Sequence, residues 1–120
     1  MSRSLTGINN LQPHRKRTGL ARKELAELLG FLSENQVGRH ERGDFFPTFL
    51  TAVSYELVFQ VRIADLFPGA YESVRRQIEE RLATFESELQ QRNAQGRKAA
   101  RIARRLEWLW ERKHPEAVLF

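Results

Sequence analysis

Residues 19–43 read GLARKELAELLGFLSENQVGRHERG, and this stretch predicts two short helices joined by a tight turn. The first helix covers ARKELAELL at residues 21–29 and ends at Gly30, a residue type that commonly closes helices. Its leucines recur at the spacing of one helix face, so we expect three of them to be buried: Leu25, Leu28 and Leu29. Together the two helices have the proportions of a helix-turn-helix.

The second helix of the pair covers residues 34–42 and begins after Ser33, whose hydroxyl can accept a hydrogen bond from an early backbone N–H. At about 100° per residue, Val37, His40 and Glu41 fall on one side of this helix. The opposite side carries a glycine together with groups of the kinds that read base edges: Glu34, Asn35, Gly38, Arg39 and Arg42.

Three residues of this helix need an interpretation of their own. Gly38 costs about 1 kcal/mol relative to alanine in a helix interior, and either lets the helix lie close to a groove floor or is tolerated at an exposed position. We expect His40 to be a partly buried core imidazole rather than a ligand or a pH switch. Glu41 is polar but faces inward, so we expect it to bond to backbone or to an arginine.

Helical periodicity dominates the rest of the chain as well, so the predicted fold class is all-α. Asn9 or Asn10 can cap a helix at about 11–18, and two more helices are expected at about 47–59 and 63–67. After a boundary signal at Pro68-Gly69, a long helix, a break and a last helix follow, with the break at 93–96 and the last helix at 97–113. The expected organisation is a flexible N-terminus, a helix-turn-helix domain and a C-terminal helical region, at 1–9, 10–69 and 70–120.

An apolar stripe runs along the long helix at an average spacing of about 3.6 residues, the period of a straight helix. Its members are Tyr71, Val74, Ile78, Leu82, Phe85 and Leu89. Each such side chain contributes roughly 1.5–3 kcal/mol when it is buried, so the stripe should be covered. Either the chain covers the stripe itself or the stripe is the face of a dimer. We favour the dimer, because a small domain cannot easily cover so long a helix.

Charge favours a polyanionic partner, since the net charge is +5 and the pI is about 10.2. Residues 97–113 hold seven Lys/Arg against two Asp/Glu, whereas residues 1–69 hold nine against seven. The basic last helix is therefore either a surface for nucleic acid or an acidic partner, or an ordinary solvated helix face.

Composition also excludes several classes of protein. The chain has no cysteine, which rules out thiolate catalysis, cysteine–zinc sites and disulfides. No apolar run approaches the roughly 20 residues of a membrane span, and the N-terminus lacks the apolar block of a signal peptide, so we expect a cytoplasmic protein without a membrane partner. There is no catalytic triad, Gly-rich phosphate loop or metal-ligand spacing, so we expect no enzyme activity, metal or cofactor.

The first half of the chain resembles the five-helix domain of the Xre family, the group of the phage Cro and CI repressors. The resemblance covers about residues 10–69 and rests on several motifs in the family's order. The second helix has the pattern Leu-Ala-x-x-Leu-Gly, matched by Leu25, Ala26, Leu29 and Gly30. The third has apolar-x-Arg-x-Glu-x-Gly, matched by Val37, Arg39, Glu41 and Gly43. A helix opened by Pro47 follows. The turn is one residue longer than in the commonest members, as in a bacterial subgroup with a Leu-Phe-Pro-Gly ending.

This resemblance implies roles for individual residues. Family members set the start of their third helix in the major groove, which implies base reading by Glu34, Asn35, Gly38 and Arg39. The implied phosphate contacts are Arg15, Arg22, Lys23, Gln36 and Arg42. Ala21-Arg22 stands where the family usually has Ser/Thr-Gln, so a capping group is lost and a longer cation is gained for phosphate.

The function predicted from these features is a sequence-specific transcriptional regulator that binds double-stranded DNA as a homodimer. Its two third helices would enter successive major grooves roughly 34 Å apart. An alternative is a protein-interaction module or antitoxin-like co-regulator that uses the C-terminal helices, with DNA binding secondary. A third hypothesis is RNA binding through the basic last helix.

Overall fold

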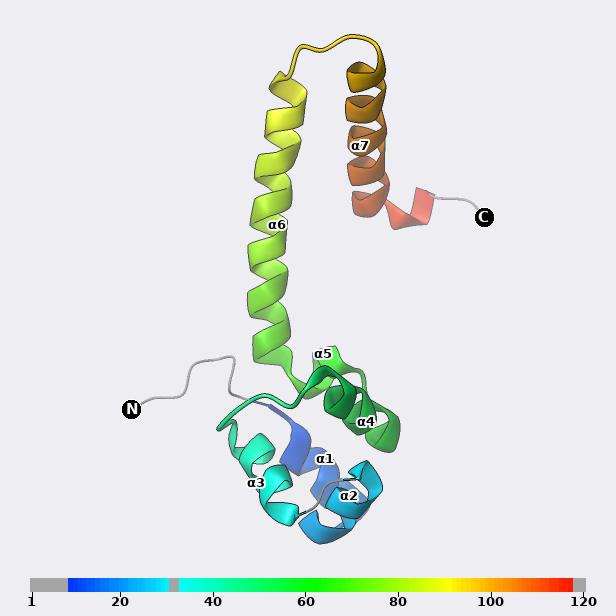
Figure 1. The fold of residues 1–120 in the computed structure, drawn as a ribbon. Helices are drawn as coiled ribbons and strands as arrows, with labels where there is room; N and C mark the ends of the chain where they lie inside the picture. The colour runs from blue at the N-terminus through cyan, green and yellow to red at the C-terminus, as the bar shows by residue number, and fades with distance from the viewer. Residues whose placement is uncertain (1–8, 31–32, 118–120) are drawn as a thin grey trace. The chain divides into compact units, whose positions relative to one another are not determined.

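A computed structural model of the chain describes residues 9–30 and 33–117, and every regular element in these ranges is a helix (Figure 1). The all-α prediction is therefore confirmed. The chain divides into two compact units, residues 1–76 and 77–120. The expected flexible N-terminus, apart from Asn9, and the Phe31-Leu32 part of the turn lie outside the described residues.

The first unit contains five helices and the start of a sixth: α1 (Leu11–Thr18), α2 (Arg22–Leu29), α3 (Glu34–Arg42), α4 (Phe49–Phe59), α5 (Ile63–Leu66) and α6 (Pro68–Gln91). The bounds of α1 and α3 are those predicted. α4 begins at Phe49 rather than at Pro47, because the Thr48 side chain accepts a hydrogen bond from the backbone N–H of Thr51 and caps the helix there. The Pro68-Gly69 signal lies at the start of α6, and Ala70 packs against the core of the first unit.

The core of the first unit is formed where α2 packs against α3 and α4, α1 against α3, and α4 against α5. Its buried members are Leu11, Leu25, Ala26, Val37, Tyr55, Leu66 and Phe67. Leu29 is half-buried at the edge of this cluster, as its spacing predicts. Leu28 is 61% exposed, so the prediction that it is buried is wrong. Its helix face is shared with charged residues that point to solvent.

Two asparagines fix the start of α1 to distant parts of the unit. The Asn9 side chain accepts a hydrogen bond from the backbone N–H of Leu11 at 3.0 Å and donates one to the carbonyl oxygen of His40 at 2.8 Å. The Asn10 side chain donates to the carbonyl oxygen of Asp65 at 2.9 Å. The end of α3 and the short helix α5 are thereby both tied to the first turn of α1.

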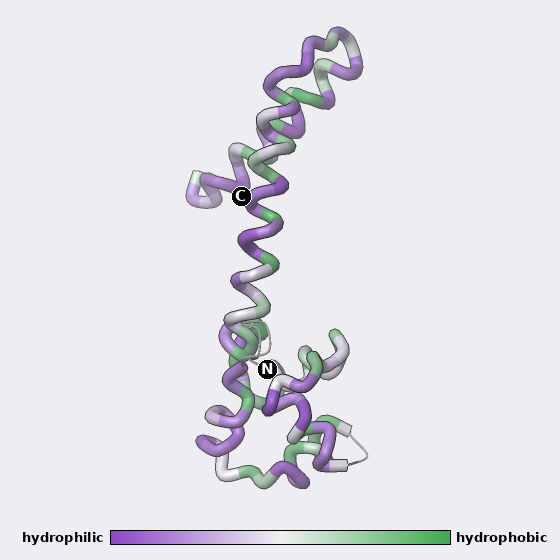
Figure 2. Tube along the Cα trace, turned by 90° about the vertical axis from the view of Figure 1, so that its left-hand side faces the viewer, coloured by the Kyte–Doolittle hydropathy of each residue, from purple (hydrophilic) through white to green (hydrophobic). Residues whose placement is uncertain are grey.

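The second unit contains the later turns of α6, the helix α7 (Arg97–Lys113) and a short 3-10 helix, η2 (Pro115–Ala117). The predicted break and last helix are confirmed, since α6 ends at Gln91 and α7 begins at Arg97. Leu89 and Leu109 are buried in this unit. Along both helices hydrophobic and hydrophilic residues alternate, as Figure 2 shows. None of the helices in the described ranges has the length and apolar character that crossing a membrane requires.

Candidate nucleic-acid interface

α3 presents a row of polar side chains to solvent. Glu34, Asn35, Gln36 and Arg39 are all exposed, and Arg42 follows at the end of the helix. Ser33 occupies the N-cap position with an extended backbone, but its side chain makes no capping hydrogen bond. The predicted bounds of this helix are thus confirmed, and its predicted exposed side is confirmed for every member except Gly38, whereas the hydroxyl cap is not formed.

The opposite side of α3 is held by the core. Val37 is fully buried, and the Nδ1 atom of His40 lies 2.9 Å from the hydroxyl oxygen of Tyr55 on α4. The imidazole also meets the rings of Phe45 and Tyr55 edge-on. Burial lowers the pKa of His40 below its ordinary value of 6.5, so the neutral imidazole is favoured. The expectation of a buried core histidine is therefore confirmed.

Tyr55 completes this contact as the largest fully buried side chain of the core. Burial raises the pKa of its phenol, and the nearby negative charge of Glu41 raises it further. The phenol therefore stays protonated and can donate its hydrogen bond to the imidazole. A rigid polar contact between α3 and α4 results, directly behind the exposed side of α3.

Glu41 is the joint between α1, α2 and α3. Its carboxylate is only 2% exposed and accepts hydrogen bonds from Nε of Arg15 at 2.6 Å and Nε of Arg22 at 3.0 Å. Arg15 adds a second bond to the carboxylate from Nη2 at 3.3 Å and donates from Nη1 to the carbonyl oxygen of Leu20 at 3.0 Å. One buried carboxylate thus fixes the position of α3 relative to two other helices, and the expectation that Glu41 bonds to an arginine is confirmed.

The structure contradicts two of the implied DNA contacts, those of Arg15 and Gly38. Arg15 is buried, and all three of its guanidinium nitrogens donate within the protein, so it is not available to a phosphate. Gly38 is also buried, which contradicts its expected place on the exposed side. A Cβ atom added there would lie 3.2 Å from Nη1 of Arg42, because the Arg42 side chain folds back over the glycine. Gly38 therefore makes room for Arg42 rather than for a groove floor.

The remaining implied phosphate contacts lie at the surface. Lys23 and Gln36 are exposed. The Arg22 side chain is 41% exposed although its Nε is bonded to Glu41. Arg42 is half-exposed and forms an ion pair of 3.2 Å with Asp44, itself exposed. Such surface pairs contribute little and exchange readily for a phosphate.

The apolar stripe of α6 is divided along its length. The early members are exposed: Tyr71, Val74 and Ile78, with Val74 57% exposed. The later members are covered within the second unit: Leu82 and Phe85 are half-buried and Leu89 is buried. Here Leu82 and Leu109 line one small hollow, with ion pairs from Arg112 and Lys113 to carboxylates of α6 beside it. Of the two alternatives for the stripe, coverage by the chain itself therefore applies to its later part.

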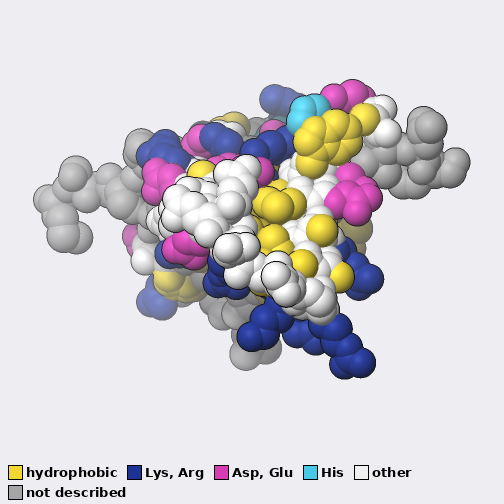
Figure 3. Space-filling view, turned by 90° about the horizontal axis from the view of Figure 1, so that it is seen from above, with side chains coloured by type: hydrophobic (Ala, Val, Ile, Leu, Met, Phe, Trp, Pro, Cys, Tyr) yellow, Lys and Arg dark blue, Asp and Glu magenta, His cyan; other side chains and the backbone are white. Residues whose placement is uncertain are grey.

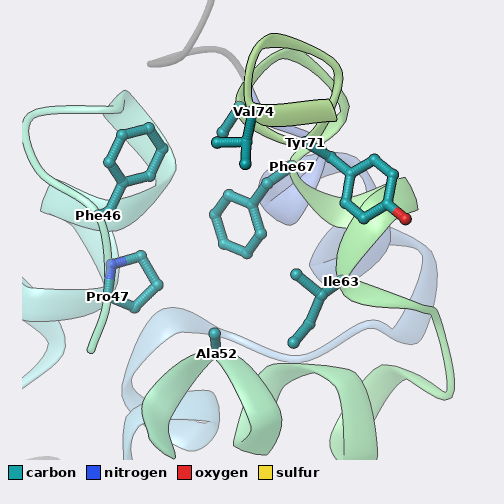
Figure 4. Close-up of a pocket in the computed structure, with 8 residues that line it drawn as sticks. Phe46, Pro47, Ala52, Ile63, Phe67, Tyr71 and Val74 are labelled. Carbon is teal, nitrogen blue, oxygen red and sulfur yellow. The ribbon is translucent and has the colours of Figure 1, made fainter. Parts of the chain in front are cut away.

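An apolar hollow of about 300 Å³ lies in the first unit beside the start of α6. Its walls come from the loop before α4, from α4 and α5, and from α6, as Figure 4 shows for Phe46, Pro47, Ala52, Ile63, Phe67, Tyr71 and Val74. The Phe67 ring lies in the middle of this group, and the Tyr71 hydroxyl points away from it (Figure 4). Within the first unit, the hollow and the exposed side chains of Tyr71 and Val74 form one apolar surface.

The sequence did not indicate which arginines pair with Glu41, and it did not indicate the hollow. Arg15 precedes Glu41 by 26 residues, and the only signal for their contact was an inward carboxylate that needed a cation. Residue spacing in the sequence did not indicate the hollow, which is lined in part by Phe46. Comparison of the chain with models of protein families, with curated proteins and with solved structures gave no match.

Proposed function

We propose that this protein is a sequence-specific DNA-binding regulator in which α2 and α3 act as an Xre-type helix-turn-helix. One observation carries the proposal: α3 exposes a row of amide, guanidinium and carboxylate groups while Glu41, His40 and Val37 fix its other side to three helices. Reading bases requires side chains that project from a rigid element. α3 meets both requirements.

The roles within this helix follow from the chemistry of base edges. Asn35 pairs with adenine, and Arg39 with the two acceptors of guanine. Glu34 accepts from a cytosine amino group. The phosphate contacts come from four side chains that retain exposed polar groups: Arg22, Lys23, Gln36 and Arg42.

A second copy of the chain is the proposed occupant of the apolar surface at the start of α6. Tyr71 and Val74 are about half-exposed there and border the hollow of about 300 Å³. Side chains of this kind rarely stay in water as a contiguous patch. A twofold contact through this surface pairs two α3 helices, as recognition of an inverted repeat requires.

The experiment that tests the function is selection of bound duplexes from a random DNA pool, followed by affinity measurements on the winning sequence. We expect an enriched inverted repeat, bound at least about 10³-fold more tightly than random duplex at the same salt concentration. A pool without enrichment contradicts the proposal and favours the protein-interaction alternative, in which the apolar surface of α6 binds another protein.

Two arginines of α3 provide a matched pair of variants. Arg39→Ala is expected to relax the preference at one base position and to cost about 1–3 kcal/mol on the selected site. Arg42→Ala is expected to weaken binding to every duplex by a similar factor, since it removes a phosphate contact. If both variants weaken all sequences equally, Arg39 does not read a base.

The dimer is tested separately by sedimentation at several protein concentrations. Val74→Glu places a charge in the apolar surface and is expected to shift the protein to monomers. Gln77→Glu adds the same charge at an exposed position of α6 and serves as the control. An unchanged dimer in Val74→Glu contradicts the assignment of this surface.

A further inference from the structure

The start of α7 and the segment before it carry a run of cations. Residues 92–106 contain six Lys/Arg and no Asp/Glu: Arg92, Arg97, Lys98, Arg101, Arg104 and Arg105. We call these six residues the cation cluster. None of them forms an ion pair with any residue of the described ranges. Farther along α7, by contrast, Arg112 and Lys113 pair with Glu79 and Glu86.

The cluster faces solvent: Arg92 precedes α7 and the other five members lie on it. Five of the six members are exposed and Arg105 is half-buried, whereas the apolar side of the helix carries the half-buried Ile102 and the buried Leu109. Arg101 borders two shallow hollows. One has a volume of about 380 Å³ and is also lined by Arg92, Lys98 and Arg105, and the other has about 210 Å³ and is also lined by Arg97 and Arg104. Each hollow is therefore bordered by several cations.

The view from above shows Lys and Arg side chains (dark blue) gathered at the lower edge, with hydrophobic side chains next to them (Figure 3). No Asp or Glu of the described residues stands among these side chains in that view. The surface is thus open to a ligand and has one sign of charge.

This arrangement opposes the stability of α7 itself. The first turn holds no acidic residue, and Gly96 at the N-cap offers no side chain to the free backbone N–H groups. Cations at a helix N-terminus repel the positive end of the helix dipole. Arg97, Arg101 and Arg105 also repeat at four-residue spacing, which places like charges side by side. Helix formation does not explain such a pattern, but an anionic ligand reverses each of these penalties.

We propose that the cation cluster binds the phosphate backbone of duplex DNA without regard to base sequence. The choice of duplex DNA as the polyanion rests on the proposed function, and the charge complementarity rests on the cluster alone. Duplex DNA carries one negative charge per roughly 1.7 Å of its axis, so several closely spaced cations can contact phosphates at the same time. Five of the six cations are arginines, whose planar guanidinium bonds a phosphate through two N–H groups.

The experiment measures binding of the full chain to a random-sequence duplex by fluorescence anisotropy at several salt concentrations. The test variant is Arg101→Gln/Arg105→Gln, which removes two central charges of the cluster. We expect it to lower affinity at least about tenfold and to reduce the slope of log affinity against log salt by about 1.8. Arg101→Lys/Arg105→Lys keeps the charges and should keep the slope.

Arg76→Gln/Arg81→Gln is the matched control, because it removes the same charge from exposed positions of α6. An equal loss of affinity and slope in this control would mean that net charge alone acts, and it would overturn the proposal. Circular dichroism checks that the test variant keeps its helices. The variant should keep them, since it removes neighbouring like charges.

Failure of this inference is distinguishable from failure of the proposed function. If the test variant binds random duplex like the wild type while the selected repeat is still preferred, the inference is overturned and the function stands. If no repeat is selected but the variant still loses affinity and slope, the inference stands and the function fails. If a single-stranded oligonucleotide or polyglutamate with the same number of charges competes as well as the duplex, the assignment to duplex DNA is overturned.

Discussion

The two units of this protein use their charged side chains in opposite ways. In the first unit a buried carboxylate, Glu41, binds two arginines and joins three helices. In the second unit the ion pairs lie at the surface, as for Arg112 with Glu79, and the start of α7 holds cations without a carboxylate partner in the described residues. The difference teaches that the first unit builds one buried carboxylate into its packing, whereas the ion pairs of the second unit stay at its surface.

The two units also differ in how many apolar side chains they bury. The cluster of the first unit has seven buried side chains drawn from α1 to α5 and the residue after α5. Among the described residues of the second unit, only Leu89 and Leu109 are buried hydrophobics. Stability should therefore reside chiefly in the first unit, while the second unit should gain order from what it binds.

The largest effect is expected for Glu41→Ala. The substitution leaves the buried guanidinium of Arg15 without its counter-charge, and breaking a buried pair in this way costs about 3–5 kcal/mol. Urea unfolding followed by circular dichroism measures the loss. Asp44→Ala removes a carboxylate of the same region from the exposed pair with Arg42 and should cost less than about 1 kcal/mol. Equal losses in the two variants would contradict the structural role of Glu41.

Cavity-forming substitutions compare the two cores directly. Leu25→Ala in the first unit should cost about 2–5 kcal/mol, since the side chain is fully buried, and Leu28→Ala on the exposed side of α2 should cost much less. Leu109→Ala should loosen the second unit while leaving the first intact. Hydrogen exchange resolved by residue measures this: faster exchange is expected in α7 and unchanged exchange in α1 to α5. Faster exchange in both units would mean that they unfold together.

Features that depend on local sequence could be predicted, whereas features that depend on packing between distant residues could not. The helix bounds depend on local signals, such as the glycine that ends α2 and the polar break before α7, and they were predicted well. The role of Arg15 was not, because its contact with Glu41 exists only after α1 and α3 pack. Gly38 was misjudged because helix geometry alone does not show that Arg42 folds back over it. The division of the α6 stripe likewise depends on where α7 lies.

A pH effect on stability is expected from His40 in the first unit. Burial lowers the folded-state pKa of His40 below 6.5, so the unfolded chain binds the proton first as the pH falls. The stabilisation is fully present above about pH 6.5 and is lost as the pH falls toward the folded-state pKa, with a slope of at most about 1.4 kcal/mol per pH unit. Urea unfolding between pH 8 and pH 5 should show a flatter dependence for His40→Gln than for the wild type. A curve as steep for His40→Gln as for the wild type would contradict the assignment to His40.

The smallest expected effect belongs to Gly38 and has the opposite sign. Gly38→Ala should stabilise the first unit by up to about 1 kcal/mol, since alanine favours a helix interior and the new methyl group meets only the mobile end of Arg42, at 3.2 Å. Gly43→Ala is the contrasting control, because Gly43 closes α3 with φ at 75° and an L-residue there should cost roughly 1–2 kcal/mol. Displacing Arg42 should also weaken binding to all duplexes slightly, without changing the preferred sequence. Gly38 is buried and is therefore not expected to contact bases. A changed sequence preference in Gly38→Ala would contradict this and assign the residue a role in base reading.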